Sequence, residues 1–208
     1  MLKAYIASPF FNDRERTLVK ELETLLPNLG IDTYSPSRDG IILKPDSDSK
    51  SRMEVLEENK RAIHECDFVL ANTDGDSLKT ILPDKVLVDL LAVLNRYRES
   101  YWIGNKEFSA IGRLVSRDPG TYWELGYAHA IGKHIITYSQ YGFDVNVMIG
   151  ESCVAHTKSW DELKEALMLF KQAATLTPLR GTVVKSEYLL NPYWSELQKK
   201  FKRDYKVF

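Results

Sequence analysis

The residues with the clearest chemical potential lie in one stretch, 118–131, which reads Asp-Pro-Gly-Thr-Tyr-Trp-Glu-Leu-Gly-Tyr-Ala-His-Ala-Ile. Pro119 and Gly120 are typical of a turn, and Thr121 can cap the helix that follows. Gly132, directly after the stretch, is a natural helix end. Glu124 would then lie in the first helical turn, where the helix dipole favours an ionised carboxylate by roughly 0.3–1 kcal/mol.

Glu124 has two interpretations. A carboxylate that stays charged beside a helix face of small residues can act as a nucleophile toward a sugar. Gly126 supports this interpretation, because a glycine inside a helix costs about 1 kcal/mol relative to alanine and is tolerated where another backbone or a ligand approaches closely. The alternative is that Glu124 only complements the helix dipole.

Other catalytic signatures do not match. Gly126 and Gly132-Lys133 are spaced one residue too far apart for a phosphate-binding P-loop, and His134 stands where that motif needs serine or threonine. The sequence contains neither a Gly-x-Gly-x-x-Gly dinucleotide signature nor a Gly-x-Ser-x-Gly nucleophile elbow. The spacing of the four histidines is not that of a paired metal-binding motif such as His-Glu-x-x-His. They are His64, His129, His134 and His156. Carboxylates are therefore the remaining source of chemistry.

Length and composition indicate an ordinary globular protein. The chain has 208 residues, of which 44% are hydrophobic and 27% charged, and this length suits one domain with an appendage. The net charge of −1 gives no electrostatic support for binding nucleic acid or an anionic membrane. Cys66 and Cys153 are too few for a disulfide framework, so we expect reduced core thiols. Without a signal peptide or a membrane-spanning run, we expect a cytoplasmic protein.

Alternating patterns of strand and helix predict a parallel α/β sheet that positions these residues. Strands are predicted at 2–7, 31–34, 68–72 and 134–138. One helix is predicted from the leucines at 18, 22, 25 and 29, with its end at Gly30, and a second from about 52 to 65. Ligands of such sheets bind beyond the carboxyl ends of the strands. We therefore expect residues 8–12, 72–75 and 118–124 to gather at one edge.

The remaining segments carry weaker signals. A polar loop at 35–50 is long enough to act as a flap, and 86–94 is apolar nearly all round, as in a buried or interface helix. A loop is predicted after residue 138, followed by a helix that opens with a capping box at 159–162. The tail at 191–205 predicts a basic amphipathic helix. It could contact a membrane or a partner, or it could dock its aromatic stripe on the core.

Three segments together resemble the nucleoside 2-deoxyribosyltransferase family, which also includes 2'-deoxynucleoside 5'-monophosphate N-glycosidases. They are the motif at 118–128, the N-terminal Tyr-Ile-Ala-Ser-Pro-Phe-Phe at 5–11, and Cys-Asp-Phe-Val-Leu-Ala-Asn at 66–72. The resemblance implies a Rossmann-like or flavodoxin-like parallel sheet sandwiched by helices. We expect this domain to span 1–175, with an inserted helical segment at about 76–117, and a C-terminal helical extension to follow at 176–208.

The resemblance implies roles for individual residues. Glu124 corresponds to the glutamate that attacks the anomeric carbon, and Tyr5 to the tyrosine that hydrogen-bonds this carboxylate. Asp118, six residues before Glu124, corresponds to the aspartate that binds the sugar 5'-hydroxyl. Asn146 and Met148 match a segment that a neighbouring subunit contributes to the sugar pocket.

Two of these matches favour a nucleoside over a nucleotide. In the monophosphate hydrolases of the family, serines tend to stand at the positions of Asp118 and Asn146, where they hold a phosphate. A carboxylate at position 118 would repel a phosphate dianion. The resemblance therefore implies a substrate with a free 5'-hydroxyl.

The remaining candidate contacts with the substrate are Asn59, Phe10, Phe11 and Gly120. Asn59 stands eight residues before Asp67, where many members have an aspartate that meets the base. Asparagine can hydrogen-bond a base edge but cannot deliver a proton as a carboxylic acid. Phe10 and Phe11 could stack on the base and exclude water, or they could be ordinary core aromatics.

The resemblance implies an enzyme that transfers 2-deoxyribose between nucleobases through a covalent glycosyl-glutamate and needs no cofactor or metal. Its expected partners are nucleosides, nucleobases and further copies of the chain that share active sites, with no nucleic acid and no membrane. Two alternatives remain open: an N-glycosidase that hydrolyses deoxynucleoside monophosphates, and a non-catalytic nucleotide sensor on the same fold.

Overall fold

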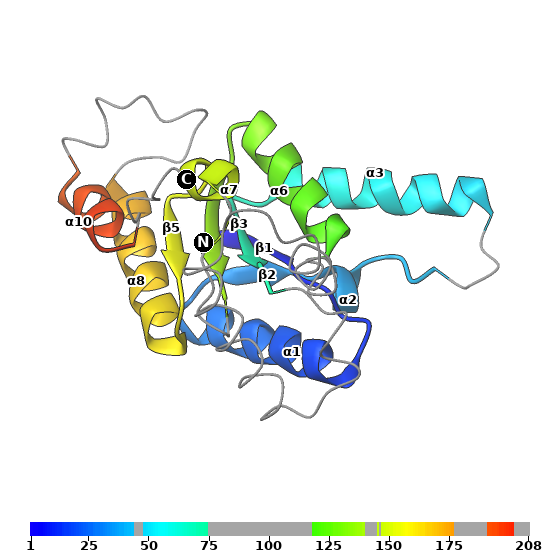
Figure 1. Ribbon diagram of the computed structural model, residues 1–208, viewed down its shortest axis with the longest axis horizontal. Coiled ribbons are helices and arrows are strands. Elements are labelled where there is room, and N and C mark those ends of the chain that lie inside the picture. The colour runs from blue at the N-terminus through cyan, green and yellow to red at the C-terminus, as the bar shows by residue number, and fades with distance from the viewer. Residues whose placement is uncertain (44–47, 75–117, 140–144, 146, 177–190, 202–208) are drawn as a thin grey trace, which may run out of the picture.

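Five parallel strands form the centre of the part of the chain that the computed structural model describes, residues 1–43, 48–74, 118–139, 145, 147–176 and 191–201 (Figure 1). The strand order is β2-β1-β3-β4-β5, which is the flavodoxin-like order. The strands are β1 (Lys3–Ala7), β2 (Asp32–Tyr34), β3 (Phe68–Asn72), β4 (His134–Tyr138) and β5 (Ala155–Thr157). The predicted fold class is therefore confirmed.

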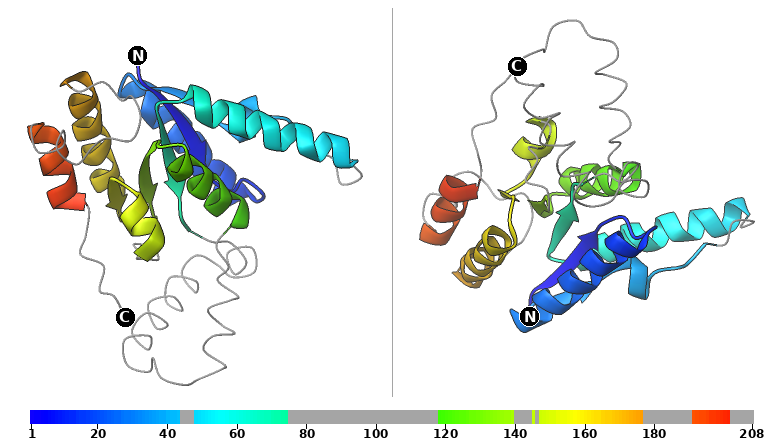
Figure 2. Two further views of the ribbon diagram at one scale, coloured as in Figure 1. Left: turned by 90° about the horizontal axis from the view of Figure 1, so that it is seen from above. Right: turned by 60° about the horizontal axis from the view of Figure 1, so that its bottom comes forward.

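Helices cover both faces of the sheet (Figure 2). One face packs against α1 (Asp13–Asn28), α8 (Trp160–Leu176) and α10 (Pro192–Phe201), and the other against α3 (Ser49–Glu65) and α6 (Pro119–Ala130). Alternate residues of a strand point to opposite faces, so Ile6 packs in the α1 layer while Tyr5 packs in the α3–α6 layer. This alternation directs Tyr5 toward the helix that carries Glu124.

Local sequence signals explain the ends of α1. Asn12 caps the helix, since its side chain accepts from the Glu15 N–H and the Glu15 carboxylate accepts from the Asn12 N–H. Its leucines face the core, and the chain leaves the helix through Gly30, which adopts φ +69°. That left-handed conformation favours glycine. The predicted helix and its predicted end are confirmed.

Among the described residues, three short elements were not predicted from the sequence. Helix α2 (Pro36–Asp39) lies inside the predicted loop at 35–50, while α7 (Val147–Ser152) and β5 follow β4 where a loop was predicted. The three residues of β5 are too few to show a periodic pattern. Their strand conformation depends on pairing with β4, in which Thr137 lies opposite His156.

The C-terminal helix docks on the core. In α10, Trp194 and Leu197 are fully buried, and the Trp194 ring lies 5.3 Å from that of Phe170 and 4.9 Å from that of His134. The docking interpretation of the tail is therefore confirmed for α10. The rest of the predicted tail helix, residues 202–205, and the insertion at 76–117 lie outside the described residues. Within the described ranges, no helix has the length and apolar character that crossing a bilayer requires.

Candidate active site

Helix α6 begins earlier in the chain than predicted, so Glu124 lies further from the start of the helix than expected. Asp118 caps the helix, because its Oδ2 accepts from the backbone N–H of Thr121 at 2.7 Å and from the Thr121 hydroxyl at 2.8 Å. The prediction that Thr121 caps the helix is wrong: Pro119 is the first helical residue and Glu124 the sixth. Glu124 therefore lies beyond the first turn, where the dipole effect has fallen off.

Three elements converge on the Glu124 carboxylate. Its Oε1 accepts a hydrogen bond of 2.6 Å from the hydroxyl of Tyr5, on β1, and a second of 3.3 Å from Nδ2 of Asn59, on α3. Glu124 is only 8% exposed and Tyr5 is fully buried. The structure thus brings together the predicted nucleophile, its predicted tyrosine partner and the residue predicted to meet the base.

The helix dipole was expected to favour the ionised form of Glu124, but the surroundings of the carboxyl favour its protonated form. Burial raises the pKa of Glu124 to about 7, the Tyr5 hydroxyl bond opposes that rise, and the nearby Asp118 charge adds to it. Burial, followed by the charge of Glu124, also raises the pKa of Tyr5 well above its ordinary value of 10. Tyr5 is therefore a permanent hydrogen-bond donor, while the Glu124 carboxyl is balanced between its two protonation states near neutral pH.

The two glycines of α6 have different surroundings. A Cβ at Gly120 would lie 3.2 Å from Oδ2 of Asp118, so glycine leaves room for the capping carboxylate. A Cβ at Gly126 would meet no described atom within 4 Å. The expectation that another backbone approaches Gly126 is therefore not met within the described residues, whereas approach of a ligand remains a prediction.

Phe10 and Phe11 lie in the loop between β1 and α1. Their rings stack with centroids 5.3 Å apart, and Phe11 is 72% exposed. The interpretation as core aromatics is therefore wrong for Phe11, because a core residue would be shielded from solvent. Contact of either ring with a base remains a prediction.

The segment expected to serve a neighbouring subunit is described in part. Met148 lies on α7 and is 73% exposed, whereas Asn146 lies outside the described residues. Neither fact tests the expected role, which remains a prediction.

The predicted edge of the sheet gathers polar groups as expected. Nδ2 of Asn72 donates to Oγ of Ser8 at 3.4 Å, which joins the ends of β3 and β1, and the Tyr122 hydroxyl donates to the carbonyl of Thr73 at 3.5 Å. The gathering of residues 8–12, 72–74 and 118–124 is therefore confirmed, and residue 75 lies outside the described part. The sequence did not single out Ser139, whose hydroxyl donates to Oδ1 of buried Asp74 at 2.7 Å.

Tyr34 was also missed as a neighbour of the site. Its ring stacks on that of Tyr5, with centroids 5.7 Å apart and planes 11° apart, because the two residues are register partners on β2 and β1. Each tyrosine occurs near the end of a predicted strand, but nothing in the sequence shows that the two strands are neighbours. The pairing of β1 with β2 supplies that information.

Comparison with known proteins gives matches to solved structures, while no family model and no curated protein matches. A 2-deoxyribosyltransferase from the psychrotolerant bacterium Bacillus psychrosaccharolyticus is 23% identical, with 78% of this chain and 90% of that chain covered and a TM-score of 0.52. A CMP N-glycosidase, BcmB, from Clostridium botulinum is 17% identical, with 81% of this chain and 98% of that chain covered and a TM-score of 0.42. A conserved protein from Enterococcus faecalis V583 is also 17% identical, with 97% of this chain and 99% of that chain covered and a TM-score of 0.44. The first of these matches establishes the fold: this chain is built on the parallel α/β fold of a 2-deoxyribosyltransferase.

Proposed function

We propose that this protein is a member of the nucleoside 2-deoxyribosyltransferase family and moves 2-deoxyribose from one nucleobase to another through a covalent bond to Glu124. The observation that carries the proposal is the buried Glu124 carboxylate, held by the Tyr5 hydroxyl at 2.6 Å. The fold shared with a 2-deoxyribosyltransferase supports it. A glutamate that only complemented a helix dipole would need neither burial nor a dedicated tyrosine donor.

The proposed reaction runs in two displacements. Breaking the bond between C1' and the base sends its electron pair to the base nitrogen and leaves positive charge on the sugar ring. A carboxylate oxygen of Glu124 donates a lone pair to C1' and forms the glycosyl-enzyme. A nitrogen of the second base then attacks C1' from the original face and releases the Glu124 carboxylate, so the configuration is retained. The proton that this nitrogen loses to solvent balances the proton that the first base takes up.

The hydrogen bonds of Glu124 suggest how the two carboxylate oxygens divide their roles. Tyr5 and Asn59 both donate to Oε1, so we assign Oε2 to the attack on C1'. Tyr5 orients the carboxylate and remains protonated throughout, because its pKa is raised. The amide of Asn59 has no acidic proton to give, so the proton that a leaving base gains does not come from residue 59.

We assign the sugar 5'-hydroxyl to Asp118. Both capping bonds of Asp118 use Oδ2, so Oδ1 is the oxygen that we expect to accept from the hydroxyl. A negatively charged side chain at this place disfavours a 5'-phosphate. The substrate class is therefore a free 2'-deoxynucleoside, and Asn146 and Met148 of a second copy complete the pocket in the assembly that we propose.

The deciding assay mixes the protein with deoxyinosine and adenine and follows the products by chromatography. We expect deoxyadenosine and hypoxanthine from the wild type, and neither from Glu124→Ala, with an unchanged circular dichroism spectrum. An acid-quenched sample of wild type with deoxyinosine should also carry one deoxyribosyl group by mass spectrometry, and Glu124→Gln should not. Glu57→Gln, which changes an exposed glutamate of α3, is the matched control and should keep full activity.

Other results would select another function. Base released from a deoxynucleoside monophosphate without exchange would make the protein a hydrolase, with water in place of the second base. Nucleotide binding without turnover of any donor, retained in Glu124→Gln, would make it a sensor. If the wild type exchanged no base with any deoxynucleoside donor, the transferase proposal would be refuted.

A further inference from the structure

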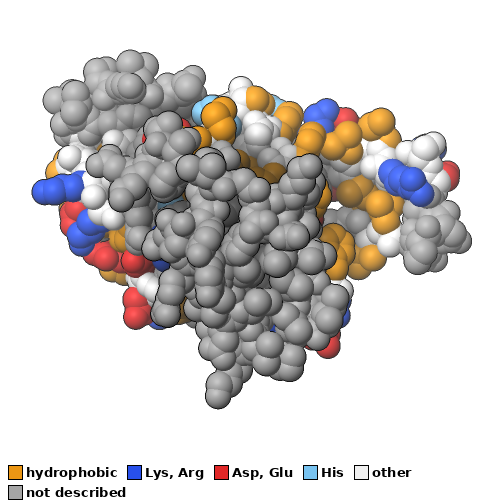
Figure 3. All heavy atoms as spheres, in the orientation of Figure 1, with side chains coloured by type: hydrophobic (Ala, Val, Ile, Leu, Met, Phe, Trp, Pro, Cys, Tyr) orange, Lys and Arg blue, Asp and Glu red, His pale blue; other side chains and the backbone are white. Residues whose placement is uncertain are grey.

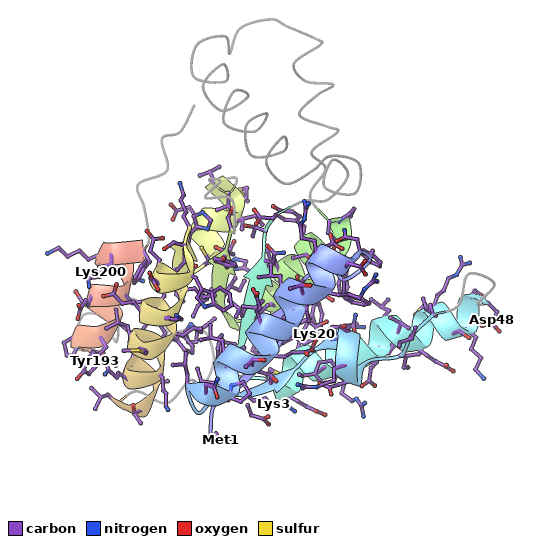
Figure 4. The ribbon with its side chains drawn as sticks, turned by 90° about the horizontal axis from the view of Figure 1, so that it is seen from below. Met1, Lys3, Lys20, Asp48, Tyr193 and Lys200 are labelled. Carbon is purple, nitrogen blue, oxygen red and sulfur yellow. The ribbon has the colours of Figure 1, made fainter. Side chains whose placement is uncertain are left out.

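Helix α3 carries Asn59 but is weakly packed over much of its length. Within the described part of the chain, its buried residues are Ala62 and Ile63, near its C-terminal end. Figure 4 shows the other end, at Asp48, projecting away from the sheet, and Figure 3 shows hydrophobic side chains on the surface on this side of the molecule. Met53 is 56% exposed. Hydrophobic packing therefore anchors α3 at Ala62 and Ile63, whereas residues 49–61, which include Asn59, have no buried side chain.

A polar contact ties this part of α3 to the sheet. The hydroxyl of Tyr34 donates to Oε1 of Glu58 at 3.1 Å, and Oε2 of Glu58 is paired with Arg61. Burial, followed by the bond to Glu58, raises the pKa of Tyr34 to about 12, so its hydroxyl remains a donor at neutral pH. Glu58 precedes Asn59 in the helix. A bond that holds Glu58 therefore also limits how far residue 59 can move.

Tyr5 and Tyr34 lie side by side and make corresponding contacts with the two helices of this layer. Tyr5 and Tyr34 are register partners with stacked rings, and each donates its hydroxyl to a carboxylate on a helix of the α3–α6 layer. Tyr5 reaches Glu124 on α6, and Tyr34 reaches Glu58 on α3. The stacked rings therefore connect the hydrogen bond to α6 with the hydrogen bond to α3.

We propose that Tyr34 and Glu58 are a positioning pair that fixes the rotation of α3 and thereby holds the amide of Asn59 against the Glu124 carboxylate. The consequence for catalysis rests on the proposed function of Glu124, whereas the positioning itself does not. Neither residue of the pair touches the reacting atoms. Their effect passes through Asn59.

A small rotation of α3 is enough to break the hydrogen bond between Asn59 and Glu124. Side chains of a helix lie about 5–6 Å from its axis, so a roll of about 20° would carry the Asn59 amide about 2 Å. The bond from Nδ2 of Asn59 to Oε1 of Glu124 is already 3.3 Å long, and a bond stretched by that amount is broken. A modest rotation of α3 would therefore remove Asn59, one of the two side chains described above that donate to the Glu124 carboxylate.

The test measures the protonation of Glu124 directly. Because Asn59 donates to the ionised carboxylate, its loss should raise the pKa of Glu124. Protein labelled with ¹³C at the glutamate carboxyl carbon is titrated by NMR, and the Glu124 signal is assigned by its absence in Glu124→Gln. The other groups that face Glu124, namely Tyr5 and Asp118, stay unchanged in every variant.

Two variants should move the signal and two should not. Tyr34→Phe keeps the stacked ring but loses the hydroxyl, and Asn59→Leu loses the donor without opening a space for water. Each should raise the pKa of Glu124 by about 0.5–1 unit, less than a short bond to a charged group would give, because the Asn59 bond is 3.3 Å long. Glu58→Gln keeps an oxygen that accepts from Tyr34, and Glu57→Gln alters only an exposed ion pair with Lys60. Both should titrate like the wild type.

The double variant separates positioning from a direct effect. Tyr34→Phe should add nothing in the Asn59→Leu background, since the bond it protects is already gone. An unchanged pKa in Tyr34→Phe or in Asn59→Leu would overturn the proposal, as would additive shifts in the double variant. A downward shift in Glu58→Gln would show instead that the Glu58 charge acts on Glu124 through space.

Activity gives a second, separable readout. The acid limb of kcat/KM against pH should move upward in Tyr34→Phe by the shift that NMR reports, and Glu58→Gln should keep the wild-type profile. An acid limb that stayed in place while the NMR signal moved would refute the catalytic consequence. If the wild type proved to have no transferase activity, the proposed function would fail, but the NMR titration would still support or overturn the positioning pair.

Discussion

Replacing Glu124 by glutamine should stabilise the folded protein at alkaline pH. The carboxyl has a pKa of about 7 in the fold, compared with its ordinary value of 4.5. Because the folded state binds this proton more tightly than the unfolded state, the resulting stability is fully present below about pH 4.5 and is lost as the pH rises through about 7. At 1.36 kcal/mol for each pH unit between the two values, the complete loss is about 3 kcal/mol.

Glutamine avoids this loss because it is never ionised, and its amide oxygen can still accept from the Tyr5 hydroxyl. Urea unfolding of wild type and Glu124→Gln should therefore give similar free energies near about pH 4 and a difference of about 3 kcal/mol near about pH 9. In a thermal scan at the higher pH, that difference corresponds to a melting temperature raised by about 6–12 °C for a chain of this size.

The control for this measurement is Glu57→Gln, which removes a carboxylate that is 58% exposed. An exposed charge of this kind should alter stability by less than about 1 kcal/mol, with little dependence on pH. If Glu124→Gln were no more stable than wild type at alkaline pH, the carboxylate would not be held in the desolvated environment that raises its pKa. The electrostatic description of the site would then be wrong.

Three further predictions follow from the same contacts. Tyr5→Phe removes the 2.6 Å donor of Glu124 and should move the acid limb of kcat/KM upward by about 1–2 pH units, the size of a hydrogen bond to a charged group; an unmoved limb in the pH–rate profile would count against the bond. Burial, followed by the charge of Lys133, lowers the pKa of His134 to about 4. The neutral ring therefore stabilises the folded state fully above about pH 6.5, and this stabilisation, up to about 3 kcal/mol, is lost as the pH falls through about 4. Urea unfolding should show that loss in wild type and a flatter profile in His134→Phe; equal slopes would contradict the assignment. Gly126→Ala should raise the unfolding free energy by about 1 kcal/mol, since a Cβ there meets no described atom within 4 Å; destabilisation in calorimetry would mean that something else occupies that space.

The local pattern predicted the elements whose residues repeat along the chain. Strands β3 and β4 have their predicted bounds, and α1 ends before Gly30 as its leucine spacing and that glycine indicated. Such elements are recognisable because each one's own residues carry the periodic signal. The three residues of β5 carry no such signal, so the pairing with β4 decides their conformation.

The sequence offered two candidate caps for α6, Asp118 and Thr121, and the prediction chose the wrong one. Asp118 and Thr121 are both common capping residues three positions apart, and Pro119 is favoured at the first position of a helix. The prediction treated Pro119 as part of a turn, although the structure makes it the first helical residue. The consequence is large, because the shift of the helix start places Glu124 in the second turn.

The sequence by itself indicated the residues to which we assign the chemistry, namely the motif around Glu124 and Tyr5 on the first strand, and it predicted the parallel strands whose ends meet at one edge. Only the tertiary structure decided the state of those groups. Whether a carboxyl is charged depends on how much solvent it loses and on the donors that reach it, and these come from β1 and α3, which lie far from Glu124 in the chain. The same holds for Tyr34, whose place beside the site exists only because β2 pairs with β1.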